Sequence, residues 1–242
     1  MRAFRRLIAT ALMAGTLSGL VWFGLQYFAV IPLIETAEKY ETMASHDHED
    51  HGTRLRRNSL TAVTTVVTAI GFAAILFGLV SLTGRRLDVK SGALWGLAAF
   101  VCIGVAPALG LPPQPPGTAA ADLASRQLWW LGTVVATGLG LYWITAPVRR
   151  PLRISAGVLC LLLPHMIGAP VAVGENVVPA PLVRQFETAS LAATGIFCLT
   201  LGVIGGLLGK DGRTTGQSPL SRSSSPDGIS AVTLSRAHDI ER

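Results

Sequence analysis

Three of the five histidines in this chain lie within one short polar segment. The sequence HDHEDH occupies positions 46–51, and a carboxylate stands beside each imidazole. Neutral imidazole nitrogen and carboxylate oxygen together suit divalent transition metals, whereas a calcium site uses oxygens in a loop of defined spacing. The pattern predicts a flexible metal-capturing loop, and the alternative is a hydrated, charged loop that binds no ion. The candidate capture residues are His46, Asp47, His48, Glu49, Asp50 and His51.

Another histidine, His165, stands inside an apolar stretch, in the sequence LLLPHMIGAP. An ionisable side chain there is a candidate for a transport path, because such groups are costly in hydrocarbon. Pro164, Gly168 and Pro170 form a hinge at which a helix could kink or break. Backbone carbonyls freed by a break could join His165 and Met166 in coordinating an ion. The alternative is a neutral His165 that hydrogen-bonds between helices, with Met166 filling space.

Two acidic positions at the ends of apolar stretches are further candidates for a cation path. Asp122 and Arg126 stand four residues apart at the predicted start of a helix. A carboxylate near the helix N-terminus and an i, i+4 ion pair are both stabilising there. That structural interpretation is the default for Asp122, and a place in an outer vestibule is the alternative. Glu35, with Glu38 and Glu41, gives either an acidic approach for cations or simply a soluble loop.

The composition indicates that membrane helices hold these residues. Half of the 242 residues are apolar and 14% are charged, against roughly 25% charged in soluble domains. The net charge of +6 comes from basic residues spread between apolar blocks, which argues against a nucleic-acid surface. The sequence has no nucleotide-binding loop, GxSxG elbow or HExxH motif, so we do not expect an enzyme.

A helix needs about 20 apolar residues to cross the roughly 30 Å hydrocarbon core of a bilayer. We therefore predict an all-α fold, a polytopic transmembrane helical bundle of about six spans that begins with an uncleaved membrane helix. Glycines at four-residue spacing favour close packing of these helices. The fifth span is the weakest, because Pro164 could leave it kinked, broken or re-entrant. The predicted spans are residues 7–31, 58–83, 92–111, 128–146, 154–173 and 188–209.

Basic residues predict the orientation of the six spans. One side of the membrane receives most of the 20 Lys and Arg residues, which places both termini in the cytoplasm by the positive-inside rule. The chain then divides into a transmembrane domain at 1–209, with a His-rich external loop at 35–57, and a cytoplasmic tail at 210–242. The tail is rich in Ser, Gly, Thr and Arg, so we expect it to be disordered.

Segments with irregular Pro, Trp and His patterns follow one another from residue 4 to about residue 208. They are FRRLIATALMAGTLSGL, VIPLIETAEKYE, HDHEDH, RNSLTAVTTVVTAIGFA, LWGLAAFVCIGVAPALGLPPQPPG, ADLASRQLWWLGT and LPHMIGAP. In this order they resemble the CbtA-type cobalt transporter subunit family of bacteria. His165 stands in the LPH motif, and Asp122 stands in the block before the paired tryptophans.

The resemblance implies an integral membrane subunit of a divalent transition-metal uptake transporter in the bacterial inner membrane. It also implies that cobalt is the transported ion, that the cobalt supplies cobalamin synthesis, and that a small, His-rich, one-helix partner subunit takes part. Ligand chemistry alone does not select cobalt, because histidine and carboxylate sites hold nickel, copper and often zinc at least as well. We expect no permanently bound cofactor. The alternative function is a membrane metal-binding or sensing protein without transport activity.

Overall fold

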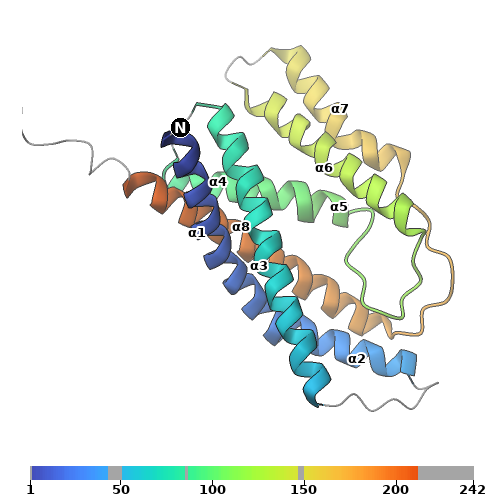
Figure 1. Cartoon of the computed structure of the whole chain (residues 1–242). Helices are drawn as coiled ribbons and strands as arrows, with labels where there is room; N and C mark the ends of the chain where they lie inside the picture. The colour runs from blue at the N-terminus through green and yellow to red at the C-terminus, as the bar shows by residue number, and fades with distance from the viewer. Residues whose placement is uncertain (1, 43–50, 85–86, 147–149, 212–242) are drawn as a thin grey trace, which may run out of the picture. The chain divides into compact units, whose positions relative to one another are not determined.

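The computed structural model describes residues 2–42, 51–84, 87–146 and 150–211 of the chain (Figure 1). Within these ranges the regular elements are helices, and extended pairing is limited to one isolated bridge between Ala120 and Val173. The predicted all-α fold is therefore confirmed. The elements are α1 (Arg2–Leu25), the π-helix η1 (Gln26–Val30), α2 (Ile31–Thr42), α3 (His51–Leu82), α4 (Val89–Phe100), the π-helix η2 (Val101–Val105), α5 (Ala106–Ala108), α6 (Leu123–Thr145), α7 (Pro151–Ile167) and α8 (Ala180–Asp211).

In the part of the chain that the structure describes, five helical segments are long and apolar enough to cross a membrane. Two of them join consecutive elements, because α1 continues through η1 into α2, and α4 continues through η2 into α5. A further apolar helix, α7, has 17 residues and a length of about 25 Å, slightly less than the hydrocarbon core. The five candidate spans are Phe4–Tyr40, Arg56–Leu82, Val89–Ala108, Leu123–Thr145 and Ala180–Gly209.

The helices α6 and α7 form an antiparallel pair (Figure 1). Gly140 of α6 and Gly157 of α7 face each other so closely that a methyl group on either would lie 2.8–2.9 Å from the other's carbonyl oxygen. Nearer the start of α6, the indole N–H of Trp129 donates to the carbonyl of Pro164, 3.3 Å away. These contacts join the early part of α6 to the late part of α7, so α7 runs back along the helix that it follows.

The two loops that flank this hairpin are bonded to each other. The N–H of Val173 donates to the carbonyl of Ala120 at 3.4 Å, and the N–H of Ala119 donates to the side-chain oxygen of Asn176 at 2.8 Å. The loop before α6 and the loop after α7 therefore lie on the same side of the membrane. If α6 crosses, as its length allows, α7 returns the chain to the side on which α6 begins.

The end of α7 differs from the prediction. The helix continues past Pro164 to Ile167, so the predicted break falls at Gly168, and residues 168–173 of the predicted fifth span are not helical. Gly168 has a φ of +87°, which glycine adopts without steric cost. The helix tolerates Pro164 because the hydrogen bond that proline cannot make affects only the last turn.

The external loop predicted at 35–57 is helical at both ends, because α2 covers its first residues and α3 covers its last. The backbone keeps right-handed helical angles on both sides of η1, so the first membrane helix runs on without a turn. The apolar face of α2 also has a partner, since Leu33 and Ile34 pack against the cluster that contains Phe186 of α8. Residues 43–50 lie outside the described residues.

Glycines let α4 and α8 approach until their backbones touch. A methyl group placed on Gly92 or on Gly202 would overlap the carbonyl oxygen of the other residue. Close approach recurs where Gly15 of α1 meets Ile70 of α3, since a methyl group on Gly15 would lie 2.6 Å from the Cα of Ile70. The packing predicted from the glycine spacing is confirmed at both contacts.

The buried core lies where α1, α3 and α8 meet. Phe197 of α8 is fully buried, and Trp22 of α1 stacks on it with ring centroids 4.4 Å apart. Phe72 of α3 meets the same ring edge-on at 6.2 Å. Glycines allow the helices to come close, and these aromatic contacts fix how α1, α3 and α8 are rotated about their own axes.

Substitution of Gly202 tests the contact between α4 and α8. We expect Gly202→Ala to destabilise the protein by roughly 1–3 kcal/mol, because the new methyl group meets backbone that cannot move aside. Gly71→Ala on α3 is the matched control, because nothing lies within 4 Å of its added methyl group and helix propensity makes it neutral or slightly stabilising. Thermal unfolding in detergent measures both effects. Equal midpoints for the two variants would contradict the contact.

Labelling with a membrane-impermeant thiol reagent tests the return of the chain through α7. In a variant without native cysteines, Thr118→Cys and Glu175→Cys should react from the same side of the membrane, because their loops are hydrogen-bonded to each other. Lys90→Cys, at the start of α4, should react from the opposite side. If Glu175→Cys reacted from the side of Lys90→Cys, α7 would not cross.

Candidate functional site

The His-rich segment predicted to capture metal lies mostly outside the described residues, and its role stays a prediction. His51 is described only as the first residue of α3. In the part of the chain whose side chains are described, no three His, Cys, Asp or Glu residues come together as a metal-binding group. The capture residues outside the described ranges are His46, Asp47, His48, Glu49 and Asp50.

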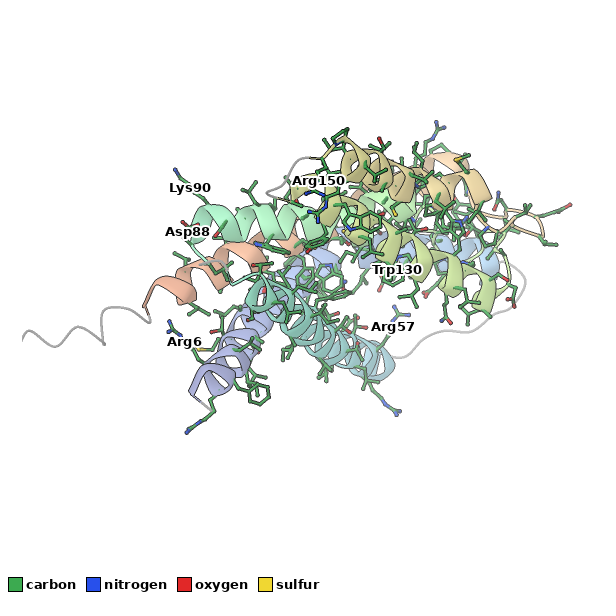
Figure 2. The ribbon with its side chains drawn as sticks, turned by 90° about the horizontal axis from the view of Figure 1, so that it is seen from above. Arg6, Arg57, Asp88, Lys90, Trp130 and Arg150 are labelled. Atoms are coloured by element: carbon green, nitrogen blue, oxygen red, sulfur yellow. The ribbon has the colours of Figure 1, made fainter. Side chains whose placement is uncertain are left out.

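Two acidic residues of α2 are held by one arginine of α3. The guanidinium of Arg57 lies 3.2 Å from the carboxylate of Glu35 and 3.4 Å from that of Glu38. Figure 2 shows Arg57 at the opposite end of the helices from Arg6 and Lys90. Glu35, predicted to lie on the cation path, is therefore paired with a cation of the protein, and this ion pair links α2 to α3.

His165 lies at the contact between α7 and α6. Its ring meets the indole of Trp129 edge-on, with centroids 6.0 Å apart and planes at 71°. Because the same indole donates its N–H to the carbonyl of Pro164, Trp129 holds this segment of α7 by two contacts. Neither imidazole nitrogen of His165 has a hydrogen-bond partner among the described residues. The interhelical hydrogen bond considered as the alternative for His165 is therefore not formed there.

The residues around His165 are less suited than His165 itself to bind an ion. Met166 is 75% exposed, and it has no role in holding α7 against α6. The carbonyl of Pro164 accepts both the Trp129 indole and the N–H of Gly168, the latter at 3.1 Å. Pro170 lies beyond the end of the helix. Within the described residues, His165 is therefore the residue of this motif that is both held against α6 and left with unpaired ligand atoms.

Asp122 caps the N-terminus of α6. Its carboxylate accepts the backbone N–H of Ser125 at 3.0 Å and the hydroxyl of the same residue at 3.2 Å. These hydrogen bonds, the backbone one first, hold the pKa of Asp122 below its ordinary value. The predicted ion pair with Arg126 is not among the salt bridges of the described residues. Likewise, none of the contacts described links Asp122, Glu35 and His165, so the predicted path residues do not form one cluster.

The sequence analysis did not single out Gln26, which is a polar residue inside the first membrane segment. It begins η1, and its side-chain oxygen accepts the hydroxyl of Thr65 of α3 at 3.1 Å. Thr65 is buried. Single-turn π-helices often occur at functional sites, and one amide within an otherwise apolar block is the sequence signal that indicates this position.

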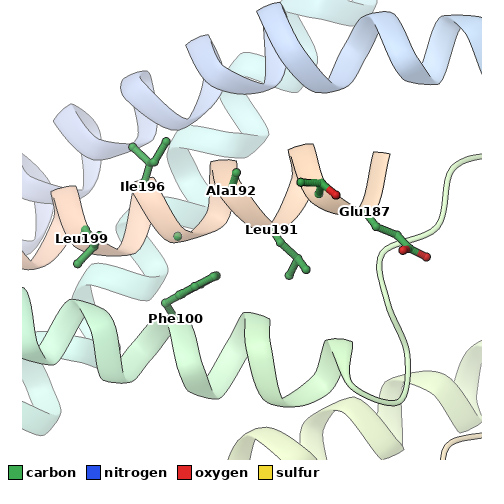
Figure 3. Close-up of a pocket in the computed structure, with 8 residues that line it drawn as sticks. Phe100, Glu187, Leu191, Ala192, Ile196 and Leu199 are labelled. Atoms are coloured by element: carbon green, nitrogen blue, oxygen red, sulfur yellow. The ribbon is translucent and has the colours of Figure 1, made fainter. Parts of the chain in front are cut away.

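His165 lines neither of two open cavities that occur along the described helices. The first, of about 550 Å³, runs along α8 opposite Phe100 and is apolar except near Glu187 and Thr188 at one end (Figure 3). The second, of about 520 Å³, lies beside the start of α6 and contains Arg126. A metal ion finds no group of ligands in either cavity.

Comparison with known proteins gives one match. The model of a family described as "Probable cobalt transporter subunit (CbtA)" matches residues 4–210. No curated protein and no solved structure matches the chain. The match covers every helix described above apart from the ends of α1 and α8, so the resemblance noted in the sequence is confirmed.

Replacement of Arg57 tests how α2 is held. Arg57→Met leaves two neighbouring carboxylates without their shared cation, and we expect it to weaken the attachment of α2 by about 0.5–1 kcal/mol, as for other partly exposed ion pairs. Arg56→Met, at the exposed preceding position, is the matched control. Hydrogen exchange of the α2 amides measures the change. Equal exchange in both variants would show that the ion pairs do not hold the helix.

Proposed function

Since the chain belongs to the CbtA family of probable cobalt transporter subunits, we propose that it carries a divalent transition-metal ion, cobalt first, across the bacterial inner membrane into the cytoplasm. The match to nearly the whole chain apart from the tail carries this proposal. Five candidate membrane-spanning helices and the returning α7 agree with it. As a transporter subunit the protein works with a partner, which we propose to be a small, His-rich, one-helix subunit.

We propose that His165, in the last turn of α7, is a ligand on the path of the ion. Neutral imidazole nitrogen is a good ligand for cobalt and its neighbours in the transition series. The imidazole is held in place by Trp129, while both nitrogens lack partners in the described part of the chain. A positioned group with unused ligand atoms supports a transient binding step, because one protein ligand binds an ion weakly enough to release it.

We also propose an orientation of the chain in the membrane. Both termini lie in the cytoplasm, and the segment at 46–51 lies outside, where its imidazoles and carboxylates gather the ion. Arg6 and Lys90 stand at one end of the helices and Arg57 at the other (Figure 2). The positive-inside rule places the end with Arg6 and Lys90 in the cytoplasm, and at the other end two carboxylates pair with the charge of Arg57.

Uptake of radiolabelled cobalt at limiting concentration tests the role of His165. We expect His165→Ala to lose most of the uptake, because it removes this proposed ligand, while His238→Ala in the tail keeps the wild-type rate. Both variants are first shown to reach the membrane in normal amounts. Unchanged uptake in His165→Ala would contradict the role of this residue.

The fluorescence of Trp129 separates transport from binding alone. In a variant with Trp129 as its single tryptophan, paramagnetic Co²⁺ at His165 should quench the emission, because the two rings lie 6.0 Å apart. Quenching that disappears in His165→Ala, together with uptake in cells, supports the transporter. Quenching without any uptake, with the partner subunit present, would favour the binding or sensing protein.

A further inference from the structure

The second cavity combines one charged group with apolar walls at the edge of the membrane. The cavity is bordered by η2 and α5, by the start of α6, and by α8. Its volume is about 520 Å³. Arg126 and Trp130 of α6 line it together with Pro107, Leu111 and Leu191. Arg126 stands three residues after the first residue of the α6 span, about 4.5 Å along the helix. The guanidinium therefore lies close to the end of this candidate span, where headgroups would meet the hydrocarbon.

The guanidinium of Arg126 has no anionic partner in the described part of the chain. The carboxylate four residues earlier, Asp122, is occupied by Ser125, and neither of the salt bridges described for these residues involves Arg126. Arg126 is half-buried. A partly buried charge without a partner is unfavourable, and the cost is relieved when an anion with oxygen acceptors binds.

We propose that this cavity binds the phosphate group of an anionic phospholipid. The guanidinium donates paired hydrogen bonds to the phosphate oxygens, and the amide of Gln127, which also lines the cavity, adds a donor. Trp130 lies at headgroup level, where its amphipathic ring is favoured. The apolar wall formed by Pro107, Leu111 and Leu191 covers the glycerol and the first methylene groups. This site is separate from the proposed cation path, because an arginine repels a metal ion.

Lipid titration of the purified full chain tests the proposal by native mass spectrometry. Phosphatidylglycerol should bind at least about tenfold more tightly than phosphatidylcholine with the same acyl chains, and Arg126→Gln should remove that preference. Arg126→Lys keeps the charge without the planar donor fork, so its preference should be intermediate. Arg184→Gln is the control, because Arg184 is exposed on α8 and does not line the cavity.

Three results would overturn the proposal. Equal binding of the two lipids by the wild-type chain would exclude recognition of the anionic headgroup. A preference that survives in Arg126→Gln, with Arg184→Gln removing it instead, would place the site elsewhere. Inorganic phosphate at millimolar concentration should leave the bound phosphatidylglycerol in place. If inorganic phosphate displaced it, the ligand would be a soluble phosphate and not a lipid.

Discussion

Contact between the backbones of α4 and α8 sets a geometry on which the neighbouring helices depend. Lipid tails are as apolar as leucine, so the hydrophobic effect does not press membrane helices together, and van der Waals packing must do so. Gly92 and Gly202 allow the two backbones to touch. Nearer the start of α8, the ring of Phe100 lies against Gly195, 3.2 Å from where a methyl group would stand. The helices are therefore joined tightly at one end and separated by an aromatic ring at the other, and the first cavity opens there.

The described polar groups near the membrane surface fall into two sets according to whether the protein satisfies them. Arg57 is satisfied by two carboxylates, and Asp122 is satisfied by Ser125. Arg126 and His165 are left without such partners in the residues that the structure describes. Desolvated polar groups are costly without hydrogen bonds, so positions where the protein leaves them unpaired are the positions where an external ligand has most to contribute.

Much of the fold follows from the sequence, because membrane crossing imposes a length and an apolar composition that can be counted directly. The glycine spacing likewise predicted close helix contacts. The end of α7 could not be placed, because Pro164 is the stronger helix breaker in the sequence, while Gly168 ends the helix through a backbone angle that only the folded chain reveals. The extension of the first helix through η1 was missed for a related reason. Its stability comes from packing against α8, a contact between distant segments.

The candidate site was less predictable. A sequence shows which side chains could bind a ligand, but it does not show which other groups those side chains contact in the folded chain. The pattern at Asp122 and Arg126 indicated an ion pair, and helix capping by Ser125 took the carboxylate instead. The exchange leaves the guanidinium of Arg126 without an anionic partner among the described residues. A half-buried charge in that state is stabilised when an anion from outside the protein binds it, and no pattern of residue types along the sequence shows this.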